Sequence, residues 1–398
     1  MNWIIVRLVD RFIGIPLLWF LRIFFWPKRY CPPKKISRIL LVKFWGAGNI
    51  MMLLPGLKAI KENYASAQVD FLTLTSNEKI LANTQMCASL ILIDVKSLSA
   101  FVKSIFTSMH KLRSMHYDIV IDFEQFARFS ALMVGFTRSP VKIGLVTRGQ
   151  HRHCLYNVRI PYNNHIHIID IFMSLFRYAF NDNRFKLCQC VDCFHFDFDS
   201  TKKKISDKGF LFNKPIVIMH VGTSPNFYLR RWPKECFAKL AIKLRDTYGV
   251  AIFFTGITGE IPISAGIMTL IENKKDIYDC VGYLSVVEFI SLVKIAGLVI
   301  SADTAPVHIA SALSIPVVAM YGPNTPDLYG PWGGKSLVFY KKLPCSPCIT
   351  NYNAKMNICR HPKGRGYCMR SISAEEVFDA IKGDIYISSW LKSIGNSK

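Results

Sequence analysis

The stretch from Ser301 to Pro326 constrains the fold of this chain more than any other. An apolar run at residues 297–301 leads into it, a polar turn follows, and a second apolar run occupies residues 316–321. Between the two runs, either Asp303 or Thr304 can cap a helix. Pro306 would then lie in the first helical turn, where the N–H that proline lacks has no partner within the helix. A strand, a helix and a second strand in this order predict two parallel strands of an α/β sheet.

The residues at the start of this helix carry chemical groups that suit an anion site. A helix N-terminus that follows a parallel strand attracts anions. Asp303, Thr304 and His308 would surround this one with a carboxylate, a hydroxyl and an imidazole. An ordinary strand-to-helix turn with a capped helix is the competing interpretation. These residues alone leave both interpretations open.

The same alternation of strands and helices occurs in two series along the chain. The first runs from a buried strand at residues 38–43 to another at 141–145, and the second begins at residues 215–220. Residues 181–213 are less regular and contain three consecutive lysines at Lys202–Lys204. Two such series predict two doubly wound parallel sheets, each a Rossmann-like domain, with ligands bound beyond the carboxyl ends of the strands in a cleft between the domains.

The chain therefore divides into four predicted parts. At 398 residues it is long enough for two domains of ordinary size. We place a membrane-anchoring segment with its linker at residues 1–35, an N-terminal domain at 36–200, a C-terminal domain at 201–375 and a C-terminal helix at 376–398.

The charge of the chain predicts a polyanionic partner. Lys and Arg number 50 against 27 Asp and Glu, which gives a formal net charge of +23. An anionic membrane surface, a phosphorylated substrate or a nucleic acid would each be attracted. The sequence contains no RNP, zinc-finger or helix-turn-helix pattern, so we expect no nucleic-acid partner. The 12 cysteines are spread unevenly along a long chain, and no cleavable signal precedes the first domain, so we expect reduced thiols and a cytoplasmic-facing protein.

Residues 1–30 differ from the rest of the chain. They are apolar and aromatic, are interrupted by Pro16 and contain five basic residues, Arg22 among them. The uncharged run is shorter than the roughly 20 residues that span a bilayer. This composition predicts an amphipathic anchor at the level of the lipid headgroups. A transmembrane helix that tolerates Arg22 and a helix packed on the first domain are the alternatives.

Two groups of cysteines could hold a metal ion. The first consists of Cys188, Cys190, Cys193 and His195. The second consists of Cys345, Cys348, Cys359 and Cys368. Structural zinc is one interpretation of each group, and free thiols are the other, because both spacings permit a zinc site without specifying one. We expect no metal or cofactor to be required.

Four blocks of sequence, in order, resemble glycosyltransferase family 9, the heptosyltransferase family of lipopolysaccharide core assembly. They are ILLVKFWGAGNIMMLLPGLKAIK at 39–61, YDIVIDFEQFARFSAL at 117–132, IVIMHVGTSPNFYLRRWPKECFAKLA at 216–241, and the stretch from Ser301 through MYGPNTP, continuing to CSPC…CMRSISAEEV at 345–377. The resemblance implies a GT-B architecture, in which two Rossmann-like domains face a central cleft and the C-terminal domain binds most of the sugar nucleotide.

The resemblance also implies site residues. Those matching the donor site are Thr223, Ser224, Arg230, Glu260, Asp303, Thr304, Ala305 and His308. The family often has a lysine at the position of Arg230, and arginine keeps the charge while presenting a planar fork. Those expected to bind the acceptor are Lys43, Gly46, Gly48, Arg128, Arg148, His151 and Arg152.

Asn49 departs from the family pattern. The resembling enzymes have an aspartate at this position, expected to deprotonate the acceptor hydroxyl, and an amide cannot take that proton. Asn49 could still orient the acceptor. The alternative bases are Asp122 and Glu124, which follow a strand end, and the histidines at 151, 153 and 165.

The expected function is metal-independent, inverting transfer of a sugar from a nucleotide-diphosphate sugar to an anionic, lipid-linked glycan. The sugar would be a heptose or a related one, and the acceptor a lipopolysaccharide core. The enzyme would lie peripherally or monotopically at the cytoplasmic face of the bacterial inner membrane. Because Asn49 replaces the aspartate, a donor-binding scaffold without transferase activity is the alternative. A sugar-nucleotide epimerase on the same architecture is a third.

Overall fold

The computed structural model describes residues 10, 12–24, 30, 33, 35–223, 225–350 and 358–393. The chain forms two compact units, unit 1 from Met1 to Phe194 and unit 2 from His195 to Lys398. The division lies shortly before the predicted boundary at 200/201. Each unit is an α/β domain and is described by itself.

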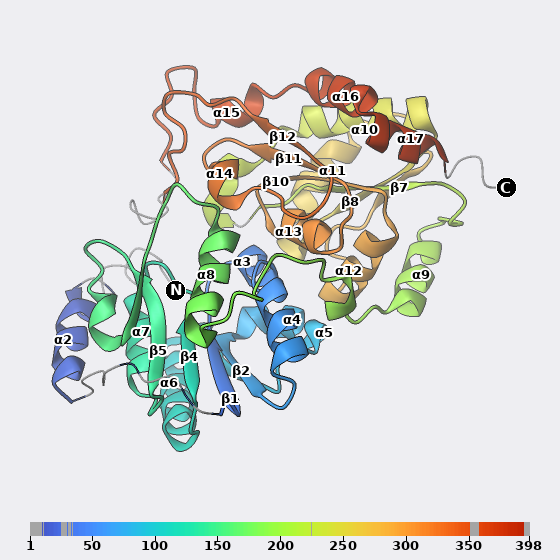
Figure 1. Ribbon diagram of the computed structural model, residues 1–398. Helices are drawn as coiled ribbons and strands as arrows, with labels where there is room; N and C mark the ends of the chain where they lie inside the picture. The colour runs from blue at the N-terminus through green and yellow to red at the C-terminus, as the bar shows by residue number, and fades with distance from the viewer. Residues whose placement is uncertain are drawn as a thin grey trace. The chain divides into compact units, whose positions relative to one another are not determined.

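Unit 1 contains a six-stranded, wholly parallel sheet (Figure 1). Its strands are β1 (Arg38–Val42), β2 (Gln68–Leu74), β3 (Ser89–Ile93), β4 (Ile119–Asp122), β5 (Val141–Val146) and β6 (Val158–Pro161). Their order is β3-β2-β1-β4-β5-β6, the order of a Rossmann fold. The winding reverses between β1 and β4, where β1 pairs with β2 on one side and with β4 on the other. Such a reversal opens a crevice for ligands at the carboxyl ends of these two strands.

The helices of unit 1 follow the predicted alternation with one correction. They are α2 (Gly14–Phe24), α3 (Ala47–Met51), α4 (Leu54–Asn63), α5 (Glu78–Thr84), α6 (Leu98–Ser114), α7 (Arg128–Gly135) and α8 (Ile168–Phe180). A single helix kinked at Pro55 is expected over residues 50–63, but the structure has two helices that break at Met52 and Leu53. Pro55 lies in the first turn of α4, where its missing N–H is tolerated.

Unit 2 repeats the same topology. Its strands are β7 (Ile216–His220), β8 (Ala251–Thr255), β9 (Ile277–Asp279), β10 (Leu298–Ala302), β11 (Val317–Tyr321) and β12 (Ser336–Tyr340). Their order is β12-β11-β10-β7-β8-β9, and every pair is parallel. The reversal therefore lies between β10 and β7. The strands that flank it are almost wholly buried, as expected for a parallel sheet covered on both faces.

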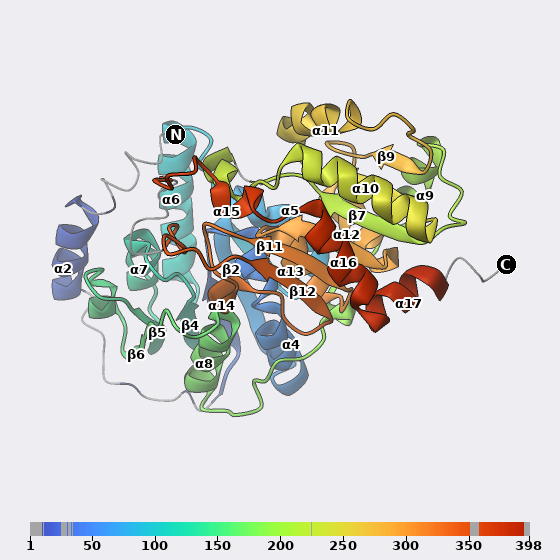
Figure 2. The same cartoon turned by 90° about the horizontal axis from the view of Figure 1, so that it is seen from above.

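The helices of unit 2 cover this sheet (Figure 2). They are α9 (Phe198–Asp207), α10 (Lys234–Tyr248), α11 (Ile261–Met268), α12 (Val286–Ile295), α13 (Ala305–Ala312), α14 (Pro326–Tyr329), α15 (Tyr367–Arg370), α16 (Ala374–Gly383) and α17 (Ile385–Ser393). Short 3₁₀ segments, η4 (Pro225–Arg230) and η5 (Thr258–Glu260), precede α10 and α11. The single C-terminal helix expected over residues 376–398 is instead a pair, and Ile381, Ile387 and Leu391 of that pair belong to the core of unit 2.

Helix α9 explains why the division precedes the lysine run. Glu288 closes the capping box of α12, where its carboxylate accepts the backbone N–H of Ser285 at 2.7 Å. The same carboxylate accepts the Ser200 hydroxyl at 2.7 Å and pairs with Lys204 Nζ at 2.9 Å, both from α9. Lys202–Lys204 therefore belong to a helix docked on unit 2, and they are not part of an irregular linker.

The N-terminal segment packs on unit 1 through α2. Leu18 and Leu21 are buried in the core that also contains residues of α7. Asp10 accepts from the backbone N–H of Arg128 at 3.0 Å and pairs with its guanidinium at 3.0 Å. Within the described ranges, no helix combines the length and apolar character needed to cross a membrane. Of the basic residues expected to anchor the segment, only Arg22 falls within those ranges.

Candidate functional site

The predicted donor residues gather at the winding reversal of unit 2. Gly222 and Thr223 follow β7, and Asp303 and Thr304 follow β10, the two strands that meet at the reversal. Arg230 is brought to the same place by η4. Ser224 lies outside the described residues. Parallel strands place their carboxyl ends at one edge of the sheet, which explains why segments distant in sequence form one site.

An ion pair between Arg230 and Asp303 is the centre of this site. Arg230 Nη1 lies 3.1 Å from Asp303 Oδ2 and donates to the Asp303 backbone carbonyl at 3.2 Å. Asn324 Nδ2 donates to the same carboxylate oxygen at 2.8 Å. The guanidinium also lies over the ring of Phe227, 4.3 Å from its centroid. Arg230 Nε is buried and has no hydrogen-bond partner in the described part of the chain, so this donor can serve an incoming acceptor such as a phosphate oxygen.

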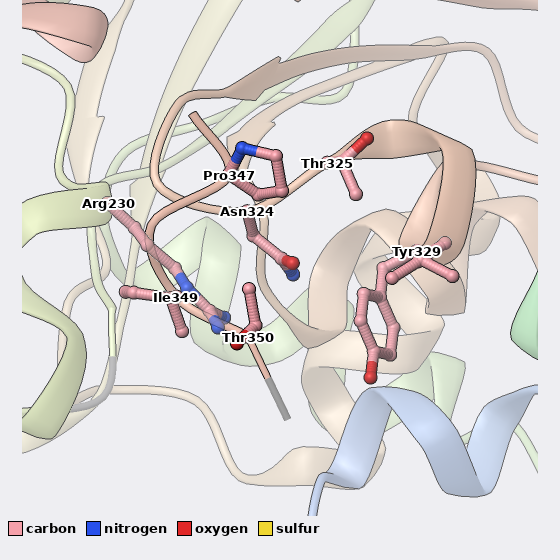
Figure 3. A pocket seen from close by; sticks show the side chains of 8 residues that line it. Arg230, Asn324, Thr325, Tyr329, Pro347, Ile349 and Thr350 are labelled. Atoms are coloured by element: carbon pink, nitrogen blue, oxygen red, sulfur yellow. The ribbon is translucent and has the colours of Figure 1, made fainter. Parts of the chain in front are cut away.

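A shallow pocket opens beside the ion pair. Figure 3 shows Arg230 and Asn324 at this pocket together with Thr325, Tyr329, Pro347, Ile349 and Thr350. Its empty volume is about 280 Å³, part of it open solvent. Its lining offers polar groups from Arg230, Asn324, Thr325, Tyr329 and Thr350.

Glu260 lies against the loop that follows β7. A Cβ atom at Gly222 would lie 1.8 Å from Glu260 Oε2, so a larger residue there would displace the Glu260 carboxylate. Glu260 is buried and accepts the backbone N–H of Ile257 at 2.8 Å. The pKa of its carboxyl group is raised, because the effect of burial exceeds the opposing effects of that N–H, the charge of Arg231 and the backbone N–H of Thr223. An acid thus lies against the loop that contains Gly222 and Thr223.

Two residues of this site have no place in the sequence-based prediction. Arg231 Nε donates to the Thr223 hydroxyl at 3.2 Å and so orients one of the predicted phosphate-contacting groups. Asn324 holds Asp303 as described above. The signals for both were the second arginine directly before the Trp-Pro pair and the polar residue that ends the Gly322-Pro323 turn.

The N-terminus of α13 is oriented toward the same site. Thr304 occupies the N-cap position, but its side chain makes no capping bond and instead shares a hydrogen bond with the Ser301 hydroxyl at 2.8 Å. Ala305 begins the helix, and His308 is buried one turn later. The capped-helix interpretation therefore does not hold in its simple form, since neither Asp303 nor Thr304 caps α13 through its side chain.

His220, at the end of β7, predicts a pH dependence of stability. Its ring Nδ1 lies 3.2 Å from the Thr255 hydroxyl, and burial lowers its pKa from 6.5 to about 4. Between these values the unfolded chain binds more protons, so stability should be complete above pH 6.5 and should fall as the pH drops toward 4. Urea unfolding at pH 7 and pH 5 should show a loss of about 1 kcal/mol in the wild type that His220→Gln lacks. Equal losses in both proteins would contradict this assignment.

Asn49 lies at the winding reversal of unit 1, in α3, which follows the glycine turn after β1. It is buried, with 7% of its surface exposed. Gly46 has φ 88°, and a Cβ atom there would approach Asn49 Nδ2 to 3.1 Å. The glycine turn therefore gives the backbone its left-handed step and leaves room for the amide.

Glu124 fixes this turn from β4. Its Oε1 accepts the backbone N–H groups of Phe44 at 2.7 Å and Trp45 at 2.9 Å, and it pairs with Lys43 Nζ at 2.9 Å. Burial raises the pKa of the Glu124 carboxyl group, but Lys43 and the two N–H groups outweigh it, so the pKa is lowered overall. Lys43 is only 1% exposed, so the structure does not support it as an acceptor contact. Glu124 acts on the shape of the turn, and its engaged carboxylate does not fit the expected role of a base.

Asp122 and Arg152 form a wholly buried pair. Arg152 Nη2 lies 2.8 Å from Asp122 Oδ2, which also accepts the Tyr156 hydroxyl at 2.6 Å. The other carboxylate oxygen accepts the backbone N–H of Glu124 at 2.9 Å. Both side chains have no exposed surface. The sequence-based expectations that Asp122 takes the acceptor proton and that Arg152 contacts an anionic acceptor therefore do not fit their environment.

The remaining acceptor candidates differ in exposure. Arg128 is buried, pairs with Asp10 and donates from Nη2 to the Gly149 carbonyl at 3.2 Å. Arg148 is exposed, and His151 is half-buried in a left-handed backbone conformation next to Trp19, with ring centroids 6.0 Å apart. Of the basic residues in the loop at 147–153, Arg148, His151 and His153 keep exposed surface, and Arg152 does not.

The cysteine groups do not form a metal centre in the described residues. There, no set of three or more His, Cys, Asp and Glu side chains could hold an ion. Cys188, Cys190, Cys193, Cys345, Cys359 and Cys368 are free thiols. A hydrogen bond from Cys190 and the charge of Lys58 lower the pKa of Cys188 to about 7. Burial raises the pKa of Cys368 to about 11.

Comparison with known proteins adds to this geometry. The family model for glycosyltransferase family 9 (heptosyltransferase) matches residues 105–358. The lipopolysaccharide heptosyltransferase 3 of Escherichia coli K12 is 22% identical over 311 residues, covering 75% of this chain and 87% of that protein.

Two solved structures show the same fold. A glycosyltransferase family 9 structure from Veillonella parvula is 17% identical, covers 87% of this chain and 97% of its own, and gives a TM-score of 0.71. The E. coli heptosyltransferase WaaC with ADP is 19% identical, covers 87% of this chain and 99% of its own, and gives 0.65. The family match extends over well over half of the chain and includes the Arg230–Asp303 site. The chain therefore belongs to glycosyltransferase family 9, the heptosyltransferase family, and is a glycosyltransferase.

Proposed function

We propose that this enzyme transfers a heptose, or a closely related sugar, from a nucleotide-diphosphate donor to a lipid-linked glycan of the lipopolysaccharide core type, with inversion at the anomeric carbon. The observation that carries the proposal is the Arg230–Asp303 pair at the winding reversal of unit 2. The names of the similar proteins support the substrate class, since one is a lipopolysaccharide heptosyltransferase and one is a heptosyltransferase solved with ADP.

The chemistry at unit 2 concerns the leaving group. When the bond between sugar and diphosphate breaks, negative charge grows on the phosphate that leaves. Arg230 supplies a positive charge whose Nε is available, and the N-terminus of α13 supplies a favourable dipole. Asp303 holds the guanidinium in place and offers carboxylate oxygens to sugar hydroxyls. Arg230 and the N-terminus of α13 are thus already positioned to stabilise the departing diphosphate.

We assign the acceptor to unit 1. Arg148 provides an exposed positive charge for a phosphorylated glycan, and the half-buried His151 provides an imidazole that can bond to it. The Asn49 amide can both donate and accept a hydrogen bond, so we give it the role of orienting the acceptor hydroxyl. An enzyme that uses a lipid-linked acceptor would work at the cytoplasmic face of the inner membrane.

A transfer assay with the purified full-length chain tests the proposal. We expect ADP-heptose, among a panel of ADP-, UDP- and GDP-sugars, to raise the melting temperature and to release its nucleotide only when a core-type glycan acceptor is present. NMR of the product should show the inverted anomeric configuration. Asn49→Ala should raise the KM for the acceptor about tenfold and leave the KM for the donor unchanged.

Three results would contradict parts of this proposal. A retained anomeric configuration would exclude a single displacement. Donor binding without turnover on any core acceptor would identify a donor-binding scaffold instead. Turnover of the sugar nucleotide to an epimer in the absence of acceptor would identify an epimerase.

A further inference from the structure

Helix α2 presents an apolar face that unit 1 does not cover. Its exposed side chains recur at intervals of three and four residues from the turn before the helix onward, so they share one side. They include Phe12, Ile13, Leu17, Phe20, Ile23 and Phe24. Ile23 is 74% exposed and Phe20 is 55% exposed. Single exposed apolar residues are ordinary, but a contiguous apolar face marks a surface that binds something.

The opposite side of α2 is already bound to the domain. Leu18 and Leu21 are buried in the core of unit 1, and Gly14 lies so close to Arg128 that an added Cβ atom would approach the Arg128 side chain to 3.1 Å. Asp10 pairs with the same arginine. Helix α2 lies beside α7 in both views (Figure 1 and Figure 2). The exposed face therefore belongs to a helix that is fixed in place, and turning that face inward would expose Leu18 and Leu21.

The charges around α2 are positive. Residues 1–30 contain five basic residues and a single acid, Asp10, which Arg128 neutralises. Beside the helix, the pKa of His153 is lowered, chiefly by burial and then by the positive charges of Arg159, His151 and Arg22. An apolar face bordered by cations is complementary to a layer that is apolar inside and anionic at its surface.

We propose that the exposed face of α2 inserts into the headgroup region of an anionic bilayer and holds unit 1 there. This inference deepens the proposed function, on which it rests for the lipid-linked acceptor. The aromatic and aliphatic side chains reach the acyl boundary, while the cations nearby contact lipid phosphates. A second copy of the chain fits less well, because a symmetric contact through α2 would bring the same cations together.

Vesicle co-sedimentation of the full-length protein tests the docking. The wild type should bind vesicles of phosphatidylglycerol and phosphatidylethanolamine, bind pure phosphatidylcholine at least tenfold more weakly, and lose affinity as salt is raised. Phe20→Glu with Ile23→Glu should weaken binding to the anionic vesicles at least tenfold. The matched control is Leu211→Glu with Ile385→Glu, which adds the same charge at residues of unit 2 that are 79% and 84% exposed. This control should bind like the wild type.

The outcomes separate docking from catalysis. Turnover of a delipidated, soluble core acceptor should be unchanged in Phe20→Glu with Ile23→Glu, and turnover of the acceptor embedded in vesicles should fall at least tenfold. The proposal would be overturned if the Phe20→Glu, Ile23→Glu variant bound anionic vesicles as tightly as the wild type. A wild-type dimer in sedimentation equilibrium that this variant abolishes, while neither protein binds vesicles, would also overturn it. A failure of transfer on the soluble acceptor with vesicle binding intact would count against the proposed function alone.

Discussion

Asp303→Ala should lower kcat about 100-fold or more, while the affinity for the donor changes less than tenfold. The carboxylate holds Arg230 at 3.1 Å and accepts from Asn324 at 2.8 Å, so its loss leaves both groups without the partner that orients them. Losing one preorganised charge-stabilising contact typically costs 10²–10³ in kcat. Binding suffers less, because the positive charge that attracts the diphosphate remains and a negative charge beside it is gone.

The measurement is kcat and donor Kd for Asp303→Ala and Asp303→Asn. The asparagine keeps the shape but not the charge, so it should also be slow. Asp246→Ala is the control, because Asp246 forms a surface pair with Arg245 in α10 and its side chain is 58% exposed. Activity of Asp303→Ala within threefold of the wild type would show that the ion pair does not serve the transfer.

Arg152→Met should lower the free energy of unfolding by about 3–5 kcal/mol, because it leaves the Asp122 carboxylate buried without its cation. The hydrogen bonds that Arg152 donates to Ser130 and to the Glu124 carbonyl are lost as well. Urea unfolding of the full-length chain, followed by circular dichroism, measures the change.

Two comparisons make this test specific. Arg184→Met removes an arginine whose side chain is 61% exposed from its pair with Asp182, and it should cost much less stability than Arg152→Met. Arg152→Met combined with Asp122→Leu removes both buried charges and should regain part of the loss. A double variant less stable than Arg152→Met would show that the Asp122 bonds to Tyr156 and Glu124 matter more than its charge.

Much of the fold follows from local sequence because each buried strand is a continuous apolar run. Residue types that favour helix ends stand where helices begin and end: Ser285 and Ser373 cap the N-termini of α12 and α16, and Gly249 ends α10 in a left-handed conformation. The strands that escape prediction are the short or edge ones. Strand β9 spans only Ile277–Asp279, and β6 lies at the sheet edge with alternating burial. Their pairing is decided by neighbouring strands, which no local pattern reveals.

The site divides in a similar way. In unit 2, the position after a strand predicts Asp303, and the resemblance to the family implies Arg230 and Glu260. In unit 1, Lys43 and Arg152 were expected to face an acceptor, and the structure buries both in ion pairs. Charged residues are ordinarily exposed. Only the tertiary structure shows which of them are buried in an ion pair with a residue of opposite charge.

The repeated strand order gives both units a carboxylate after the fourth strand and a cation reached from the end of the first. In unit 1 these are Glu124 and Lys43, and the lysine side chain is 1% exposed. In unit 2 they are Asp303 and Arg230, and the arginine side chain is 14% exposed. In unit 1 the pair is buried and stabilises the turn after β1, whereas in unit 2 the pair keeps some solvent exposure. The same strand order thus buries the pair almost completely in unit 1 and leaves it partly exposed in unit 2.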